Sequence, residues 1–318
     1  MNIDVLKAGA QTTLQDGGRV GWRHLGVGVA GALDAYSATL ANRLVGNGAN
    51  EAVLEIALTG PTLRFHAAAR IAIAGADIDA RVDAQALPGW RPIELPADSV
   101  LQLGACRRGA RAYLAVRGGF DLVPVLGSAA TDLRAGFGGH QGRALRIGDL
   151  LRTRVAQDET TTLHIAPWWI DPRPDLDLDR DALLHVLPGR DATRPLDALA
   201  LEDWRVGAAS DRQGVRLDGA PLSLAQDGER ISEPVAPGTI QLPPDGRPIV
   251  LLADAQTVGG YPCIGHVIGA DLPRLAQCRP GDTIRFAPID RAPALARRRA
   301  QAQRLARIEL AIAQRALG

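Results

Sequence analysis

The stretch Arg70-Ile71-Ala72-Ile73-Ala74 alternates β-branched and small residues and ends at Gly75, which is typical of a β-strand. Six other short stretches are β-branched or alternating and are likewise bounded by Gly, Pro or Asp: Thr62–Phe65, Val100–Leu103, Ala112–Val116, Thr239–Leu242, Ile249–Leu252 and Thr283–Phe286. The 35 glycines and 21 prolines are spread along the chain, which indicates many turns between short strands. We therefore predict a mostly β fold.

Helices are expected in three places. The segment Asp34–Val45 opens with an Asp at the N-cap position and closes at Gly46-Asn47. The segment Asp271–Cys278 is also capped by its first Asp, and Pro273 stands in the first turn, where a missing N–H costs little. The third segment, Ala294–Ala316, is amphipathic, and we expect its apolar stripe to pack on the body of the protein or on a partner. The stripe consists of Leu295, Leu305, Ile308 and Ile312.

Length and pattern indicate two similar halves. A chain of 318 residues is expected to hold about two domains. Gly148-Asp149 and Gly281-Asp282 each precede a closing strand, which is a weak internal echo. The Pro- and Asp-rich segment Trp168–Asp181 lacks apolar periodicity and is the best linker candidate, and strand signals resume at Ala182–Leu187. We predict an N-terminal half at residues 1–160, a C-terminal half at residues 161–290 and a helix at residues 291–318.

The basic residues are almost all arginine, because Lys7 is the one lysine among 36 basic side chains. Schiff-base chemistry, a P-loop lysine and covalent biotin or lipoate would all have to use Lys7. Its surroundings, Val5-Leu6-Lys7-Ala8-Gly9, match none of these motifs. The 36 basic and 35 acidic residues nearly cancel, which argues against a nucleic-acid partner or a membrane-surface partner.

Cysteine and histidine spacing argues against a disulfide framework and against a metal site. Cys106, Cys263 and Cys278 are odd in number and far apart, which fits a reducing cytoplasm. No histidine has a second one within about five residues, as a short zinc motif requires. The segment Met1–Leu6 has neither a basic nor an apolar leader region, and the chain has no apolar run of about 18 residues. We expect a cytoplasmic protein that is neither exported nor membrane-spanning.

Two motifs favour a structural interpretation over a functional one. Gly26-Val27-Gly28-Val29-Ala30-Gly31 matches the dinucleotide fingerprint, but Gly21–Leu25 before it is too polar for the buried strand that this fingerprint requires. We interpret it as a glycine turn. Cys263 and His266 could meet on a helix as nucleophile and base, but the glycines around them favour a loop or strand, which argues against a catalytic dyad.

Three constellations place charged or amide residues among glycines: Gln15-Asp16-Gly17-Gly18-Arg19, Ser210-Asp211-Arg212-Gln213-Gly214 and Asp254–Tyr261. An arginine can fork onto a carboxylate, a nearby aspartate can orient it or act as a base, and glycine N–H groups can hold an oxyanion. Turns stabilised by Asp and Arg explain the same pattern, so the residues alone leave both interpretations open.

A known family carries these constellations together with further motifs in the same order. They are Thr12–Gly21, Gly31–Asp34, Ala41–Asn47, Leu54-Glu55, Gly75–Asp77, Tyr113–Asp121, Val125–Ser128, Leu133–Gly139, Ser210–Leu217, Ile231–Glu233, Gln241–Gly246, Gln256–Pro262 and Asp271–Leu275. On these residues the chain, up to about Ile289, resembles the 5-oxoprolinase C-subunit, also described as KipA or allophanate hydrolase subunit 2, in the biotin-dependent carboxyltransferase-like group. The chain departs from the family at Gly17, Gln213 and Val215, and Cys263 stands where a basic residue is common.

The resemblance implies two cyclophilin-like β-barrel units with a few short helices and a C-terminal amphipathic helix. It also implies a hydrolase component that works with a KipI-like B-subunit and a LamB/YcsF-like A-subunit in a complex that cleaves the cyclic amide 5-oxo-L-proline to L-glutamate with ATP. ATP would be used by the complex without a complete site on this chain, and no biotin would be attached here.

Two other functions stay open. One is the carboxyltransferase subunit of a biotin-dependent urea or amide carboxylase, or of an allophanate hydrolase-type system. The other is a KipA-like regulatory protein that binds a KipI-like kinase inhibitor.

We predict one set of catalytic residues and a larger set of substrate-binding residues, without dividing the catalytic ones into base and orienter. The catalytic set is Asp16, Arg19, Asp211 and Arg212. The substrate-binding set is Gln15, Asp34, Asn42, Arg117, Gln256, Thr257, Gly259, Gly260 and Tyr261.

Overall fold

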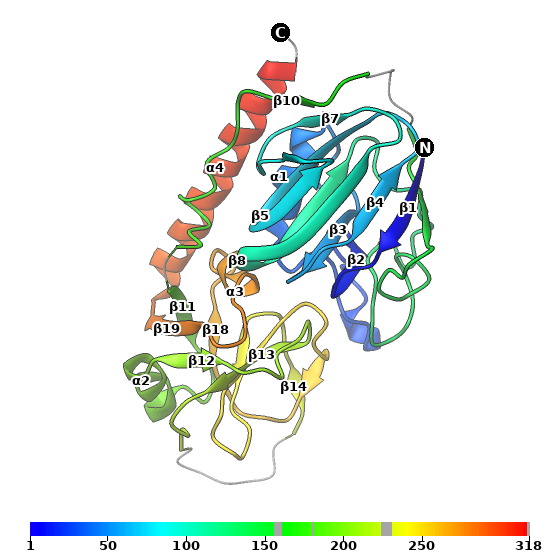
Figure 1. Cartoon of the computed structure of the whole chain (residues 1–318). Helices are drawn as coiled ribbons and strands as arrows, with labels where there is room; N and C mark the ends of the chain where they lie inside the picture. The colour runs from blue at the N-terminus through cyan, green and yellow to red at the C-terminus, as the bar shows by residue number, and fades with distance from the viewer. Residues whose placement is uncertain (156–160, 180, 224–230, 317–318) are drawn as a thin grey trace. The chain divides into compact units, whose positions relative to one another are not determined.

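The computed structural model describes residues 1–155, 161–179, 181–223 and 231–316. The chain divides into two compact units. The first unit consists of Met1–Arg19, Ala30–Leu178 and Ala306–Gly318, and the second consists of Val20–Val29 and Asp179–Leu305. Strands make up most of the regular structure of both units (Figure 1), which confirms the prediction of a mostly β protein.

The first unit is built on one antiparallel sheet. Over the described residues its strands are β1 (Asn2–Lys7), β2 (Gln11–Gln15), β3 (Val53–Ala57), β4 (Thr62–Phe65), β5 (Ala69–Val82), β6 (Gln85–Ala86), β7 (Ile93–Leu95), β8 (Val100–Val116), β9 (Leu150–Arg152) and β10 (His164–Ile165). The main path runs β10-β7-β5-β8-β4-β1-β9, while β2 joins through β3 to β8 and β6 pairs with β5. Strand β3 thus lies between β2, which ends at Gln15, and the long strand β8.

Strands β5 and β8 form a long pair, and here the sequence prediction was incomplete. Val100–Leu103 and Ala112–Val116 were expected as separate strands but are the two ends of β8. The register between β5 and β8 shifts at several points between Gly75 and Ala80, so bulges absorb the irregular middle of the pair. Arg107 and Arg108 in that middle form exposed ion pairs with aspartates of β5, and they therefore do not end the strand.

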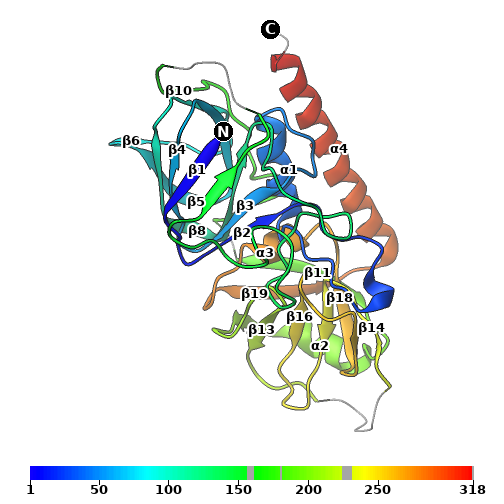
Figure 2. The same ribbon diagram turned by 90° about the vertical axis from the view of Figure 1, so that its right-hand side faces the viewer.

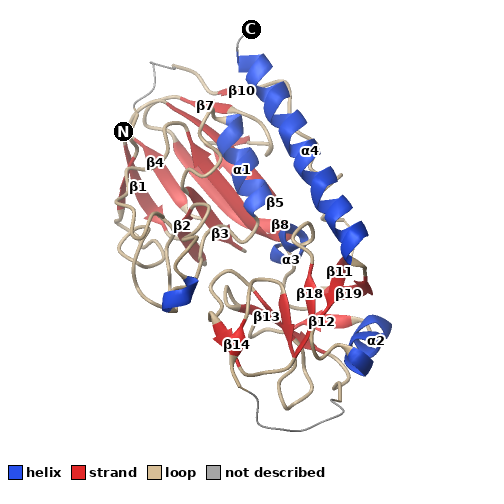
Figure 3. Cartoon of the chain, turned by 180° about the vertical axis from the view of Figure 1, so that it is seen from behind, coloured by secondary structure: helices blue, strands red, loops and turns tan. Residues whose placement is uncertain are grey.

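Helix α1 (Ala35–Leu44) packs against strands β5 and β8 of the first unit (Figure 3). The expected N-cap is confirmed, because the Asp34 carboxylate accepts a hydrogen bond of 2.9 Å from the Ser37 N–H. The helix buries Tyr36 and Leu40 toward the sheet. The main apolar core of this unit consists instead of strand and loop residues, among them the fully buried Ile3, Leu14, Leu54, Ile71 and Leu114.

The second unit is a closed barrel of strands in the order β11-β18-β15-β16-β13-β12-β19 (Figure 2). These strands are β11 (Ala182–Pro188), β12 (Trp204–Val206), β13 (Gly214–Asp218), β15 (Thr239–Gln241), β16 (Ile249–Leu251), β18 (Cys263–Val267) and β19 (Thr283–Pro288). Strands β14 (Glu233–Pro234) and β17 (Val258–Gly259) pair separately. Trp204 of β12 is fully buried, and its indole N–H donates to Leu199 O at 3.0 Å in helix α2 (Thr193–Leu201), a helix that the sequence did not predict.

Two helix details differ from expectation. Helix α3 (Leu272–Ala276) follows Asp271, but this carboxylate does not cap it. Instead, Asp271 accepts hydrogen bonds from the His185 main-chain N–H at 2.7 Å and ring Nδ1 at 2.8 Å. In helix α4 (Arg291–Ala316), Ile312 is buried as predicted, but Leu295 is 41% exposed. Burial of the apolar stripe therefore increases from Leu295 toward Ile312 near the C-terminal end of α4.

Among the described residues, no helix combines the length and apolar character needed to cross a membrane.

Candidate functional site

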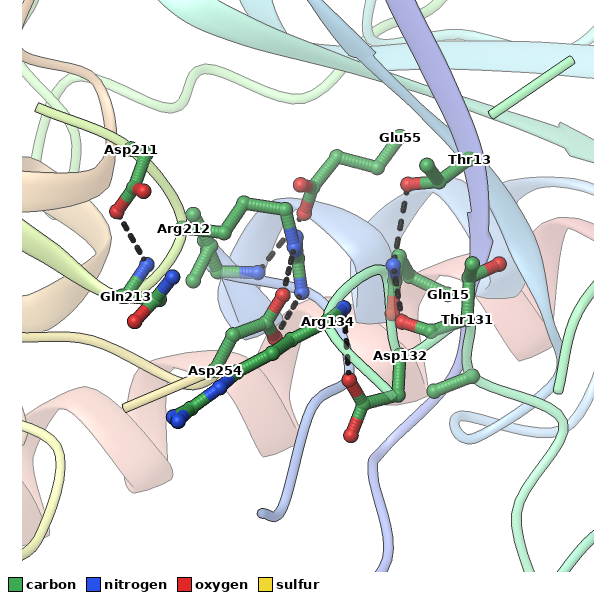
Figure 4. A network of polar contacts seen from close by, with 12 residues as sticks. Thr13, Gln15, Glu55, Thr131, Asp132, Arg134, Asp211, Arg212, Gln213 and Asp254 are labelled. Carbon is green, nitrogen blue, oxygen red and sulfur yellow. Dashed lines mark hydrogen bonds and ion pairs between the residues drawn. The ribbon is translucent and has the colours of Figure 1, made fainter. Parts of the chain in front are cut away.

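Gln15 ends strand β2 with its side chain fully buried. Its amide nitrogen donates to Thr13 Oγ1 at 3.0 Å and to Thr131 O at 3.1 Å (Figure 4), and its amide oxygen accepts from the Gly31 N–H at 3.1 Å. Gly31 has a φ of 84°, and a Cβ there would lie 2.8 Å from Gly18 N, so this position requires glycine. Gln15 therefore ties two glycine-rich turns to the end of β2.

Asp16 is held by three hydrogen-bond donors. Its Oδ1 accepts from the Gly18 N–H at 2.8 Å and from Ser128 Oγ at 2.6 Å, and its Oδ2 accepts from the Ala129 N–H at 2.6 Å. Both carboxylate oxygens are thus engaged with the chain's own turns. This arrangement positions the loop at Ser128–Ala129 against the Gly17-Gly18 turn.

Arg19 is a fully buried arginine. Its Nε donates to Val125 O at 3.2 Å, its Nη2 donates to Ala130 O, and the guanidinium carbon lies 4.5 Å from the centre of the Phe137 ring. Main-chain carbonyl dipoles and an aromatic face therefore surround this charge. Gln15, Asp16 and Arg19 all contact the loop at residues 125–137, so the structure brings these three predicted residues together.

A buried polar cluster lies beside helix α1, and two of its members were not predicted as site residues. Glu55 on β3 accepts hydrogen bonds at 2.9 Å from the Leu33 N–H and from the Tyr113 hydroxyl (Figure 4 shows Glu55). The Tyr113 hydroxyl in turn accepts from the Asp34 N–H at 2.8 Å. Burial, followed by the charges of Glu55 and Asp34, raises the pKa of Tyr113 well above its ordinary value. A charged residue inside the apolar run Val53–Ala57 was the signal that could have revealed this cluster.

Asn42 and Arg117 take different places in the first unit. Asn42 is buried near the end of α1, where its amide donates to Glu51 O at 2.7 Å and its oxygen accepts from Asn47 at 3.0 Å. Arg117 follows β8 and has an exposed side chain. Its main-chain N–H donates to Arg70 O at 2.9 Å. Asn42 is thus engaged in holding the end of the helix, while Arg117 faces solvent.

The Ser210–Gly214 constellation of the second unit contains one exposed and one buried charge. Asp211 is exposed, and its Oδ1 accepts from the N–H groups of Gln213 at 2.8 Å and Gly214 at 3.2 Å (Figure 4). Arg212 is 4% exposed and donates through Nε at 2.8 Å and Nη2 at 2.9 Å to the two oxygens of Asp254. This bidentate pair joins two of the three predicted constellations.

Gln256 and Thr257 follow Asp254 closely in the sequence and belong to the same unit. Gln256 donates from Nε2 to Gln241 Oε1 at 3.2 Å, and Thr257 is buried, with its carbonyl accepting from the Val235 N–H at 3.0 Å. Arg23, which was not predicted, donates from Nη2 to Val235 O and, at 3.5 Å, to Gln256 O. Burial lowers the pKa of Arg23.

A pocket of about 380 Å³ opens in the second unit and is lined by three predicted residues, Gly259, Gly260 and Tyr261. Gly259 approaches Gln241 so closely that a Cβ would lie 2.5 Å from its Nε2. The pocket also contains residues that were not predicted for the site: Arg190, Asp191, Glu233, Thr239, Cys263 and His266.

Cys263 and His266 lie on strand β18, which confirms the expected strand, but they meet nonetheless. Cys263 Sγ is 3.4 Å from His266 Nε2. The register of β18 against β15 shifts between Ile240 and Gln241, and this bulge brings two residues three apart in sequence within reach of each other. The sequence predicted that a strand would disfavour a contact between Cys263 and His266. The structure shows the contact, so this prediction was wrong.

The structure also bears on the dinucleotide fingerprint and on metal binding. The segment Gly26–Gly31 follows a 3-10 turn, Arg23–Leu25, and not a buried strand, so it lacks the strand that the dinucleotide fingerprint requires. In the part of the chain that the structure describes, no three His, Cys, Asp or Glu side chains gather closely enough to hold a metal ion.

Comparison with known proteins assigns the family. The model of the carboxyltransferase domain, subdomain A and B, matches residues 25–288. The chain belongs to this carboxyltransferase domain family. Within it, the chain is 38% identical to the 5-oxoprolinase C-subunit of Escherichia coli, over 94% of this chain and 95% of that protein. It is 35% identical to the protein of the same name in Haemophilus influenzae, over 90% of this chain and 91% of that protein.

Larger members of the carboxyltransferase domain family contain a similar region. The crystal structure of urea amidolyase from Kluyveromyces lactis superposes with a TM-score of 0.88 at 30% identity. That match covers 96% of this chain but only 20% of the larger protein. The resemblance to the 5-oxoprolinase C-subunit and the mostly β fold expected from it are thus confirmed. The shared part is a region of much longer proteins elsewhere in the family.

Proposed function

We propose that the chain is the C-subunit of an ATP-dependent 5-oxoprolinase, which hydrolyses the cyclic amide of 5-oxo-L-proline to L-glutamate. The observation that carries this proposal is the match to the 5-oxoprolinase C-subunit of E. coli along 94% of this chain and 95% of that protein. The urea amidolyase of Saccharomyces cerevisiae, by contrast, is matched over only 16% of its length.

The proposed partners are a KipI-like B-subunit and a LamB/YcsF-like A-subunit. A five-membered lactam is a stable amide, and ATP hydrolysis supplies the driving force for opening it, with ADP and phosphate as by-products. We assign the ATP site to the complex. The turn in this chain that most resembles a nucleotide fingerprint, Gly26–Gly31, follows a 3-10 turn and does not fit that role.

The contacts within each unit suggest a division of labour among the proposed site residues. The side chains of Gln15, Asp16 and Arg19 form hydrogen bonds with loop residues of this chain. These contacts support a role in positioning the loops. Asp211 is exposed, and only its Oδ1 is engaged by the described N–H groups. We therefore propose Asp211 as the carboxylate that contacts the amide, with Arg212 fixed next to it in sequence by Asp254.

The test is reconstitution with the two partner proteins and measurement of ATP-dependent glutamate formation from 5-oxo-L-proline. We expect turnover to disappear when this chain is omitted, and unchanged turnover would overturn the proposal. Asp211→Asn should lower turnover while the complex still assembles. Asp245→Asn is the matched control, because Asp245 is an exposed aspartate of the same unit that also accepts from a main-chain N–H, that of Arg247 at 3.1 Å. Equal turnover in the two variants would remove Asp211 from the site.

A further inference from the structure

The pocket in the second unit contains a nucleophile, a base and an orienting group in series. Cys263 Sγ lies 3.4 Å from His266 Nε2, and His266 Nδ1 lies 3.3 Å from Thr239 Oγ1. Thr239 is buried, and its Oγ1 also accepts from the Ala236 N–H at 3.2 Å. A nucleophile within reach of a base, which a third group orients, is the arrangement that activates cysteines in enzymes.

The hydrogen bonds of Thr239 bear on which nitrogen of His266 carries the proton. With one lone pair used by Ala236 N–H, the hydroxyl oxygen of Thr239 has a second lone pair that can accept from Nδ1–H. The Nε2 lone pair then faces the Cys263 thiol and can receive its proton. Burial raises the pKa of Cys263 and lowers that of His266, so both groups are neutral at neutral pH.

We propose that Cys263 is a covalent binding site for small uncharged electrophiles of the conjugated carbonyl class, with His266 as its base. As Sγ attacks the β-carbon, an S–C bond forms, the thiol proton moves to His266 Nε2 and the C=C electron pair moves to the α-carbon. His266 then returns the proton to the α-carbon, so the product is a thioether and the imidazole is regenerated.

The surroundings of the thiol set the kind of electrophile. A volume of about 380 Å³ suits a small molecule. Arg190 is paired with Glu233 at the edge of the pocket, so its charge is already compensated. Asp191 accepts a hydrogen bond of 3.0 Å from the Cys263 N–H, and its negative charge adds to the raised thiol pKa. The Asp191 carboxylate beside the thiol therefore disfavours an anionic reagent relative to a neutral one.

The test measures labelling of the whole chain by N-ethylmaleimide, followed by mass spectrometry of the cysteine peptides. Cys278 is the internal control, because it is also half-buried and its Sγ contacts Arg274 O at 3.5 Å. Burial raises the pKa of Cys263, so without a base this thiol should react slowly at neutral pH. We expect Cys263 to react faster, and labelling no faster than that of Cys278 would overturn the proposal.

The base is tested by His266→Gln, with the exposed His24→Gln in the same unit as control. We expect His266→Gln to slow labelling of Cys263 by about a hundredfold or more while the rate at Cys278 stays the same. In the unmodified chain the Cys263 rate should be level between the pKa of His266 and that of the thiol, whereas in His266→Gln it should rise about tenfold per pH unit. Equal rates in the two variants would exclude His266 as the base.

A second measurement needs no variant. Iodoacetamide and iodoacetate differ in charge, so the ratio of their rates reports the field at each thiol. We expect the ratio to favour iodoacetamide more strongly at Cys263 than at Cys278, and equal ratios would overturn the assigned preference for uncharged electrophiles. Neither measurement depends on the proposed 5-oxoprolinase activity.

Discussion

Arg19 in the first unit and Arg212 in the second are both buried, yet their charges are stabilised in different ways. Arg19 donates to the carbonyls of Val125 and Ala130 and stacks on Phe137. Arg212 donates both ends of its guanidinium fork to the carboxylate of Asp254. One charge is therefore surrounded by dipoles of a folded loop, and the other by a full opposite charge.

The difference teaches what each arginine can hold in place. Carbonyl dipoles come from a loop that must fold around Arg19, so this arginine ties loop residues 125–137 to the Gln15-Asp16 turn. The carboxylate of Asp254 is one side chain, so Arg212 joins two short segments with strong directionality. Removing a partner should accordingly have unequal consequences in the two units.

The largest effect is expected for Asp254→Ala. This change leaves the buried Arg212 guanidinium without its carboxylate, and breaking a buried pair from one side costs about 3–5 kcal/mol of unfolding free energy. Urea denaturation followed by circular dichroism measures it. The double variant Arg212→Met/Asp254→Ala should lose less than the sum of the single changes, because no unpaired charge remains. A loss as small as that of the exposed Asp245→Ala would show that the pair is not what holds this site.

A smaller loss is expected for Arg19→Met, which keeps the length of the side chain but removes its donors. The carbonyls of Val125 and Ala130 lose a charged donor, which should cost about 1–3 kcal/mol. Unfolding in urea should become easier, and proteolysis should begin within loop residues 125–137. If the loss matched or exceeded that of Asp254→Ala, the carbonyl cage would be the stronger of the two arrangements.

The sequence predicted both Arg19 and Arg212 as catalytic residues but could not show that they are buried. Gln15-Asp16-Gly17-Gly18-Arg19 indicates polar groups among glycines, which fits either a ligand site or a set of turns. The deciding acceptors of Arg19 lie 106 and 111 residues further along the chain, and the partner of Arg212 lies 42 residues away. No local pattern encodes contacts at these separations, and therefore the choice required the structure.

The fold was predicted best where side-chain alternation is regular. Arg70–Ala74 lies within β5, and Asp34 begins α1 as its sequence predicts. Prediction was poorest at irregular backbone, because bulges change which side chains share a face. The middle of β8 was missed for this reason, and so was the contact between Cys263 and His266.

The pair Arg143–Asp149 sharpens the comparison, because it repeats the bidentate geometry of Arg212–Asp254 at a less buried place. Arg143 donates to the Asp149 oxygens at 2.7 and 2.8 Å, and these bonds lower the pKa of Asp149 from 3.8 to about 2. Because the folded-state pKa is depressed, the stabilisation is fully present above pH 3.8 and is lost as the pH falls through about 2.

Arg143→Gln should therefore reduce the unfolding free energy by about 1–2 kcal/mol at pH 7, less than the loss on Asp254→Ala. The difference from the unmodified chain should stay constant down to about pH 4 and shrink below it, because the unfolded chain then binds a proton at Asp149 that the folded chain does not yet bind. Denaturation curves between pH 7 and about pH 2.5 measure this. A difference that grew as the pH fell would contradict the assignment to Asp149.

The smallest effect is expected from Phe137→Leu, which removes the aromatic face beside Arg19 but keeps an apolar side chain of similar reach. A guanidinium carbon 4.5 Å from a ring centre gains about 0.5–1 kcal/mol from the ring. A double-mutant cycle with Arg19→Met isolates this part, since the ring should matter only while the guanidinium is present. If Phe137→Leu were as destabilising without Arg19 as with it, the ring would contribute packing alone, and the Arg19 charge would depend entirely on its carbonyl partners.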